Sequence, residues 1–197
     1  MKKSPLANTG FAGFIGTQFL GAFNDNIFKM LVICAAAAVL TPEAKRDYIP
    51  LASALFILPY LLFSAFAGYL ADRFSKRSVM IATKAAEIVI MATGLVLFHF
   101  NAVYALLAVL FCMGAQSAFF SPAKYGFLPE TLPPENLSSG NGATQLFTFL
   151  AIILGGWAGS QLADTYKASF QTVVEMTRPG DPDARQAVEA WAARYMV

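Results

Sequence analysis

Residues 51–78 read LASALFILPYLLFSAFAGYLADRFSKRS, an apolar run that ends abruptly in a charged string. About 20 apolar residues in a helix are enough to cross the roughly 30 Å of hydrocarbon in a bilayer. Pro59 interrupts the run, but a membrane helix tolerates a proline when neighbouring helices satisfy the freed backbone groups. The stretch therefore predicts a membrane-spanning helix over 51–71 that stops at DRFSKRS.

Four similar apolar runs occur elsewhere in the chain, one before this run and three after it. The whole chain is 57% apolar and 13% charged, whereas an ordinary soluble domain is about a quarter charged. We therefore predict an all-α polytopic membrane protein with five transmembrane helices, at residues 11–40, 51–71, 79–98, 103–120 and 141–163.

The segments between these runs are expected to be loops. TPEAKRDYIP, 41–50, separates the first two helices, and a proline-rich structured loop follows Ser121. From Asp164 the chain becomes polar, so residues 164–197 are predicted to form an extracytoplasmic loop. Within that loop a short amphipathic helix is expected, because apolar residues recur at helical spacing at Ala184, Val188, Trp191 and Tyr195.

The distribution of Lys and Arg predicts the orientation. Short cytoplasmic loops carry an excess of these residues. Placing the N-terminus in the cytoplasm puts six of these residues on that side, namely Lys2, Lys3, Arg73, Lys76, Arg77 and Lys124. Only Lys45, Arg46 and Lys167 then flank the opposite side, and a long translocated tail obeys the charge bias poorly.

Several classes of function are not expected. A net charge of +2, without a band of clustered Lys and Arg residues, does not indicate a nucleic-acid-binding surface. His99 is the single histidine, and the residues after it lack the aspartate of an H-x-x-x-x-D acyltransferase site. No phosphate-binding glycine loop or cluster of metal ligands is seen either. We expect no catalytic residues, no metal and no cofactor.

The clearest candidate site is FNDNIFK, residues 23–29. An ionisable residue near the middle of a membrane helix is costly unless it is paired or hydrated. Asp25 and Lys29 are four residues apart, so they share a helix face and can pair, and Asn24 and Asn26 add polar groups beside them. Asp25 is then either part of a substrate or coupling-ion site, or half of a salt bridge that fixes the helix to its neighbours.

Other polar or small residues in the runs have simpler explanations. Lys84 and Glu87 are three apart and are expected to form a structural pair, although a functional role stays open. Lys124 is a possible site residue, and the alternative is that it only anchors the cytoplasmic end of the fourth predicted helix by snorkelling. Gly155 and Gly159 form a G-x-x-x-G pattern, which suits close packing against another helix.

The charged string GYLADRFSKRS, 68–78, resembles the G-x-L-a-D-r-x-G-r-[KR] signature between helices two and three of the major facilitator superfamily. The matching residues are Gly68, Leu70, Asp72, Arg73 and Arg77, and Ser75 departs from the usual glycine. The resemblance implies a gating role for this motif. LGGWAGSQLAD, 154–164, similarly resembles the superfamily's fifth-helix glycine motif without its proline.

Three motifs together narrow the resemblance to the bacterial lysophospholipid transporter family: QFLGAFNDN at 18–26, GYLADRF at 68–74 and SPAKYGFLPE at 121–130. This implies a multi-pass protein of the bacterial inner membrane that moves lysophospholipid cargo. Lys124 matches a residue of the third motif. Because superfamily members pair two six-helix bundles, the chain is expected to be a partial N-terminal half that works with the missing remainder of the transporter.

Two alternatives remain at this stage. Some family members are fused to an acyltransferase and an acyl-ACP synthetase, so the chain is also compatible with the membrane module of a 2-acylglycerophospholipid acyltransferase/synthetase fusion. Neither enzymatic module is seen in these residues. The other alternative is a major-facilitator transporter of a different small molecule, because the GYLADR motif alone carries no information on cargo.

Overall fold

The structure, a computed structural model, describes residues 9–100 and 102–176, without the side chains of residues 38, 39 and 166–176. These ranges contain helices and no strand. The elements are α1 (Thr9–Val39), α2 (Pro42–Arg73), α3 (Lys76–His99), α4 (Val103–Thr131), the short 3-10 helix η2 (Pro134–Asn136) and α5 (Leu137–Met176).

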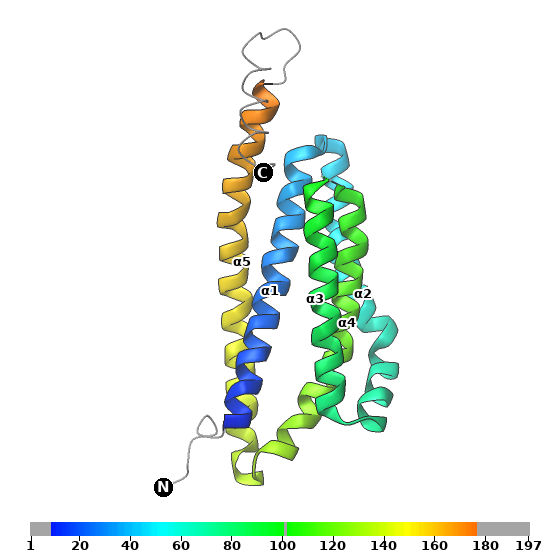
Figure 1. Cartoon of the computed structure of the whole chain (residues 1–197), viewed down its shortest axis with the longest axis vertical. Coiled ribbons are helices and arrows are strands. Elements are labelled where there is room, and N and C mark those ends of the chain that lie inside the picture. The colour runs from blue at the N-terminus through cyan, green and yellow to red at the C-terminus, as the bar shows by residue number, and fades with distance from the viewer. Residues whose placement is uncertain (1–8, 101, 177–197) are drawn as a thin grey trace.

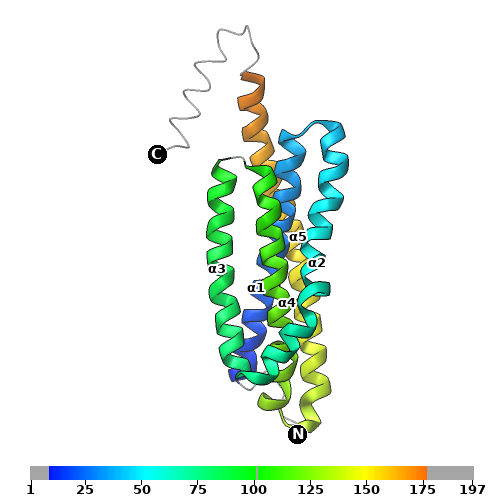
Figure 2. The same ribbon diagram turned by 90° about the vertical axis from the view of Figure 1, so that its right-hand side faces the viewer.

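The long helices run up and down, so that successive helices point in opposite directions (Figure 1). Five helices in the described ranges are long and apolar enough to cross a membrane. The predicted all-α architecture with five membrane-spanning helices is therefore confirmed. α5 packs along α1, and α4 packs against both α2 and α3 (Figures 1 and 2).

α4 is the central helix of the bundle. In the 18-residue apolar stretch of α4, 61% of the residues are buried. In the corresponding stretches of the other four membrane-spanning helices, 11–28% of the residues are buried. Leu106, Leu110 and Met113 of α4 are almost fully buried and pack with Val32 of α1. At the same end of the core, the hydroxyl of Tyr48 donates a hydrogen bond to the carbonyl of Val103. Side chains on α4 are therefore within reach of most other helices.

The loop expected at 41–50 is wrong, because α2 begins at Pro42. Thr41 has extended backbone angles, and its side chain accepts a hydrogen bond from the amide of Ala44 at 3.4 Å. Proline fits the first helical position, where an amide hydrogen would have no partner, and Glu43 suits the positive end of the helix dipole. These local capping signals outweigh the polarity of the segment.

The loop expected after Ser121 is mostly wrong as well. α4 continues through Pro122 and Pro129 as far as Thr131, so that only a short connection containing η2 remains. The hydroxyl of Ser121 donates to the carbonyl of Ser117 at 3.0 Å, just before the first proline. Side-chain hydroxyls of this kind can re-satisfy backbone groups near a proline in a membrane helix.

The boundary expected at Asp164 also differs from the structure. α5 is helical from Leu137 to Met176, so the first part of the predicted polar loop extends the helix. The amphipathic helix predicted around Ala184–Tyr195 lies outside the described residues.

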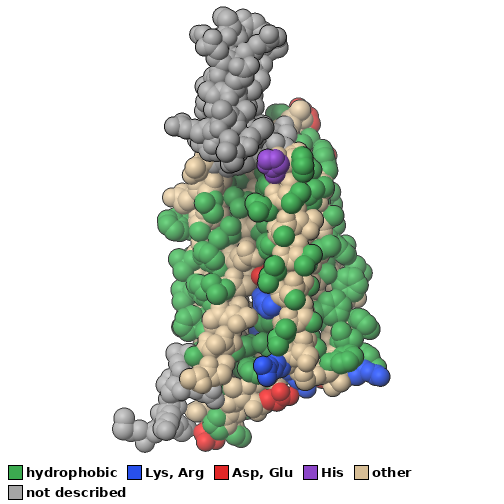
Figure 3. Space-filling view, viewed as in Figure 1, with side chains coloured by type: hydrophobic (Ala, Val, Ile, Leu, Met, Phe, Trp, Pro, Cys, Tyr) green, Lys and Arg blue, Asp and Glu red, His purple; other side chains and the backbone are tan. Residues whose placement is uncertain are grey.

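Charged side chains gather at one end of the bundle. Arg73, Lys76 and Arg77 lie around the turn between α2 and α3, at the same end as the start of α1. Figure 3 shows Lys and Arg side chains clustered at this lower end, below a surface that is mostly apolar. Lys45 and Arg46 lie at the opposite end, in the first turns of α2.

Two glycines bring α5 very close to α1. A Cβ atom built on Gly155 would lie 2.5 Å from the carbonyl oxygen of Phe23, and one built on Gly159 would lie 2.8 Å from the Cβ of Met30. Both distances are too short for any larger residue without movement of the backbones. The G-x-x-x-G pattern thus lies at the α1–α5 contact, where small residues allow helices to approach.

We expect Gly155→Ile to separate α1 from α5 and to lower the free energy of unfolding by about 1–3 kcal/mol through overpacking. Gly156→Ile is the matched control, because a Cβ built on Gly156 has nothing within 4 Å. Unfolding of the native gene product by SDS, followed through tryptophan fluorescence, measures the difference. Equal destabilisation by the two variants would contradict the close α1–α5 contact.

Candidate functional site

A polar cavity of about 290 Å³ opens inside the bundle, between helices that are otherwise apolar. α1 and α4 supply most of its polar walls, and α2, α3 and α5 complete it. Its lining residues are Gln18, Gly21, Ala22, Asp25, Asn26, Lys29, Phe56, Tyr60, Lys84, Gln116, Ser117, Phe120, Ser121, Lys124, Thr148 and Ile152. Charged side chains are also visible midway along the surface in Figure 3, far from the charged end.

Asp25 lies near the middle of α1 and has one carboxylate oxygen without a partner. The hydroxyl of Ser117 on α4 donates to Oδ2 of Asp25 at 2.9 Å. The other oxygen, Oδ1, is buried and accepts no hydrogen bond in the described part of the chain. A buried carboxylate oxygen is costly unless a donor or cation meets it. Asp25 is therefore equipped to bind a cationic group that enters the cavity.

The predicted pairing of Asp25 with Lys29 is not formed. Within the described residues no ion pair joins them; instead the ammonium of Lys29 lies 5.4 Å from the ring centroid of Phe56 on α2. The hydrogen bond from Ser117 holds the carboxylate of Asp25 against α4. Lys29, one helical turn further along α1, lies over Phe56 of α2 instead. Both side chains still line the same cavity, so they contribute opposite charges to one space.

The two predicted asparagines have different roles. The amide of Asn26 donates to the carbonyl of Ala22 within its own helix at 2.8 Å, while its side chain still lines the cavity. The amide of Asn24 turns to the other side and donates to Glu87 on α3 at 3.3 Å. Only Asn26 therefore belongs to the cavity wall.

Lys84 and Glu87 form the ion pair that their spacing predicts. The carboxylate of Glu87 is 8% exposed and accepts hydrogen bonds from Lys84, from Asn24 and from the amide nitrogen of Gln116 at 3.1 Å. This network ties α3 to α1 and α4 and supplies the buried carboxylate with several donors, as a buried charge requires. It is a structural clamp whose lysine also reaches the cavity.

Gly21 makes room for that lysine. A Cβ built on Gly21 would lie 2.2 Å from the Nζ of Lys84, so no side chain fits there while Lys84 crosses toward α1. The same ammonium lies 4.7 Å from the ring centroid of Phe120 on α4. Lys84 is thereby held at the cavity wall by contacts from three helices.

Lys124 does not snorkel to the surface. Its side chain is 7% exposed, it lines the cavity, and its ammonium lies 4.7 Å from the ring centroid of Tyr125. No carboxylate lies within 4.0 Å of it in the described structure. Since Pro122 continues α4 instead of ending it, Lys124 stays within the helix and faces inward.

The cavity as a whole combines separated charges of both signs. Three lysines line it, Lys29, Lys84 and Lys124, against the single lining carboxylate of Asp25. Lys84 is neutralised by Glu87. Among the described residues, no carboxylate pairs with Lys124, and one oxygen of Asp25 accepts no hydrogen bond. The arrangement is suited to a ligand that carries both a negative and a positive group.

Sequence reasoning missed several polar residues of this site. Ser117 and Gln116 on α4 are neutral, so they gave no sign of a site before α4 was known to be central. Gln18 and Thr148 also line the cavity, where the amide of Gln18 donates to the hydroxyl of Thr148 at 3.1 Å. Their pairing joins residues far apart in the sequence, which no local spacing reveals.

The predicted gating residues lie away from the cavity. Gly68 lies in the last two turns of α2, and Asp72, Arg73 and Arg77 are exposed at the turn between α2 and α3. The guanidinium of Arg73 donates to the hydroxyl of Tyr69 at 2.8 Å. Beside them Lys76 pairs with Glu130 at 3.4 Å and joins the start of α3 to the end of α4. The motif and the cavity are thus separate sites.

Among the described residues, no group of three or more His, Cys, Asp and Glu side chains is placed to hold a metal ion. The chemistry of the cavity rests on ammonium, carboxylate, amide and hydroxyl groups.

Comparison with known proteins identifies relatives of the chain. The lysophospholipid transporter LplT of Klebsiella pneumoniae is 33% identical over 159 residues, which cover 81% of this chain and 38% of that protein. The LplT proteins of Citrobacter koseri and Cronobacter sakazakii are 33% and 31% identical, and the matches cover 83% and 89% of this chain. The chain spans about two fifths of the length of these relatives, 38–42%.

No solved structure matches the chain significantly. The family model described as Major Facilitator Superfamily matches residues 14–173, which include most of α1, all of α2, α3 and α4, and nearly all of α5. The cavity and the α2–α3 motif both lie inside the matched residues. The chain belongs to the Major Facilitator Superfamily.

Proposed function

We propose that the chain is the N-terminal part of a secondary transporter that moves lysophospholipids across the bacterial inner membrane, with its N-terminus in the cytoplasm. The similarity of the chain to lysophospholipid transporters supports this cargo. The excess of Lys and Arg at the end where α1 begins supports the orientation.

The observation that carries the proposal is the unmatched pair of charges in the cavity. A lysophosphatidylethanolamine head group has an anionic phosphate and a cationic ammonium. Lys124 supplies a buried positive charge for the phosphate, and the free oxygen of Asp25 accepts from the ammonium. Because both groups are removed from water, each is more strongly attracted to an opposite charge than at a surface.

The cavity forms one wall of the transport pathway. In transporters built from paired repeats, cargo binds near the middle of the membrane at the interface between the halves. We infer that the remainder of the transporter closes the cavity from the other side. Transport itself is a physical step, so this chain has no enzymatic role in the proposal, and any acyltransferase or synthetase would act on the delivered lipid as a separate module.

The α2–α3 motif is proposed to control the change of access. Asp72, Arg73 and Arg77 are exposed at the end of the bundle, and none of them forms an ion pair within the described residues. Charges in this position can pair with the rest of the transporter in one state and separate in the other. Their absence from the cavity lining supports a role in movement and not in cargo binding.

Asp25→Asn should reduce lysophosphatidylethanolamine uptake by at least about tenfold, because the amide keeps the bond to Ser117 but loses the charge that meets the ammonium. Uptake into spheroplasts expressing the native gene product at equal levels measures the effect. Asp47→Asn, an exposed residue near the start of α2, is the matched control. Unchanged uptake in Asp25→Asn would remove Asp25 from the proposed site.

Lys124→Met should weaken binding of lysophosphatidylethanolamine by about ten- to a hundredfold, since a charge-assisted contact to the phosphate is lost. Monoacylglycerol, which lacks the phosphate, should bind the variant and the unaltered protein equally. Native mass spectrometry of the gene product in nanodiscs gives both affinities, with Lys45→Met as the control. A parallel loss for both lipids would show that Lys124 supports the fold and does not contact phosphate.

Arg73→Ala should slow transport by about tenfold while changing lysolipid affinity by less than about twofold, because a gating residue acts on the conformational step. Arg46→Ala, at the opposite end of α2, should change neither quantity. Initial rates in proteoliposomes and affinities in nanodiscs separate the two effects. A fall in affinity equal to the fall in rate would count against a gating role.

A further inference from the structure

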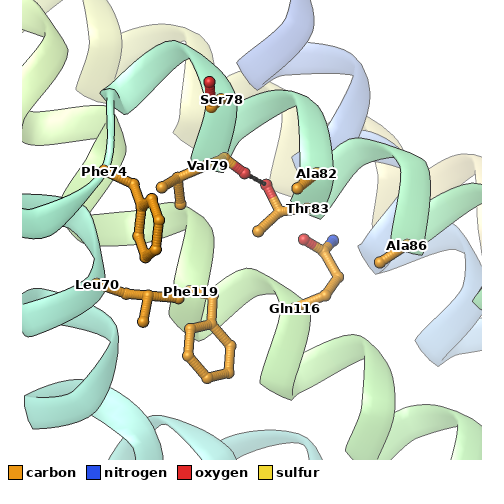
Figure 4. Close-up of a pocket in the computed structure, with 9 residues that line it drawn as sticks. All are labelled: Leu70, Phe74, Ser78, Val79, Ala82, Thr83, Ala86, Gln116 and Phe119. Carbon is orange, nitrogen blue, oxygen red and sulfur yellow. Dashed lines mark hydrogen bonds between the residues drawn. The ribbon is translucent and has the colours of Figure 1, made fainter.

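A second hollow, almost entirely apolar, lies on the outer side of the bundle between α2, α3 and α4. Its volume is about 470 Å³, and its lining residues are Leu70, Phe74, Ser78, Val79, Ala82, Thr83, Ala86, Gln116 and Phe119 (Figure 4). We call it the outer groove. Figure 4 shows Leu70, Phe74 and Phe119 along one side and the amide of Gln116 near Ala86 on the other.

Gln116 is the residue shared by the outer groove and the polar cavity. Its side chain is 6% exposed, so it forms the partition between the two spaces. A polar side chain at the inner end of an apolar groove needs an explanation, because its hydrogen-bonding groups are cut off from water.

The two ends of the Gln116 amide are in different situations. Its nitrogen donates to Oε2 of Glu87 at 3.1 Å, which fixes which end is nitrogen and which is oxygen. Its oxygen, Oε1, is buried and accepts no hydrogen bond from the described residues. In Figure 4 this oxygen is turned toward Thr83. The hydroxyl of Thr83 lies 3.0 Å from the carbonyls of Val79 and Met80 in its own helix, so it is already engaged.

We propose that the outer groove holds the acyl chain of the lysophospholipid and that Gln116 Oε1 accepts a hydrogen bond from the free glycerol hydroxyl. This inference rests on the proposed function. A lysophospholipid differs from a diacyl phospholipid at one position of the glycerol, where a hydroxyl replaces the second acyl ester. Gln116 is the group that distinguishes the two lipids.

The order of the chemical groups along the protein matches their order along the lipid. Charged residues in the cavity meet the head group, the lone acceptor at Gln116 comes next, and the apolar groove follows. Glycerol lies between head group and chain in the lipid. A diacyl lipid offers only an ester at this position, which cannot donate, so it would leave Oε1 unpaired.

The test compares oleoyl lysophosphatidylethanolamine with its deoxy analogue, in which hydrogen replaces the free glycerol hydroxyl. The native gene product in nanodiscs should bind the lysolipid about tenfold more tightly than the deoxy analogue, because a site built for a hydroxyl leaves its acceptor unpaired without one. In Gln116→Met the ratio of the two affinities should fall to about one. Gln161→Met, at an exposed glutamine of α5, should keep the ratio of the unaltered protein.

The ratio of the two affinities distinguishes a loss of lipid recognition from a defect in folding. A purely structural defect lowers both affinities together and leaves their ratio unchanged, and that result in Gln116→Met would overturn the inference. Equal affinities in the unaltered protein would overturn it without any variant. If the unaltered protein binds neither the lysolipid nor its deoxy analogue, the proposed function is overturned as well. Failure of the inference and failure of the proposed function therefore give different results.

The groove itself is tested by filling it. Ala86→Phe should reduce the gain in affinity from a 10-carbon to an 18-carbon chain, whereas Leu95→Phe, at an exposed position on the opposite face of α3, should leave that gain unchanged. Dioleoyl phosphatidylethanolamine is included in both series. If it binds as tightly as the lysolipid and responds in the same way, the groove is filled by bulk lipid only, and the inference is wrong.

Discussion

The structure depends on the requirement that every charge within the membrane is matched by other groups of the bundle. Glu87 on α3 meets this requirement fully, with donors from Lys84, Asn24 and Gln116, and its network holds three helices together. Asp25 on α1 meets it only in part, because Ser117 satisfies one of its two oxygens. The same physical constraint therefore separates a carboxylate that stabilises the bundle from one that is available to a ligand.

The central position of α4 makes this division possible. Gly114 allows α2 to approach, since a Cβ there would lie 2.3 Å from the carbonyl oxygen of Phe56. With α4 packed inside, Gln116 and Ser117 donate hydrogen bonds to carboxylates of neighbouring helices, and Lys124 lines the polar cavity. Gln116 then separates a polar cavity from an apolar groove, an arrangement that suits an amphipathic ligand better than a small polar one.

The sequence predicted the helices well and their ends poorly. An apolar run predicts a membrane helix because its length must match the thickness of the membrane. The ends of a helix depend instead on local capping, as at Thr41, and on prolines, which α4 accommodates. Asp25, Lys84 and Glu87 were identified because charge inside an apolar run is conspicuous. The actual partners of Asp25 and Lys29 are Ser117 and Phe56, and these could not be foreseen because they come from other helices whose packing the spacing does not determine.

We propose that the cavity recognises a lysophospholipid. The most direct test of this proposal is binding of fluorescent lysophosphatidylethanolamine to the native gene product in nanodiscs, with unlabelled competitors. We expect saturable binding that unlabelled lysophospholipids displace and that sugars and small water-soluble drugs do not. Displacement by those small polar molecules, with no effect of lysophospholipids, would contradict the account and indicate a transporter for a different cargo.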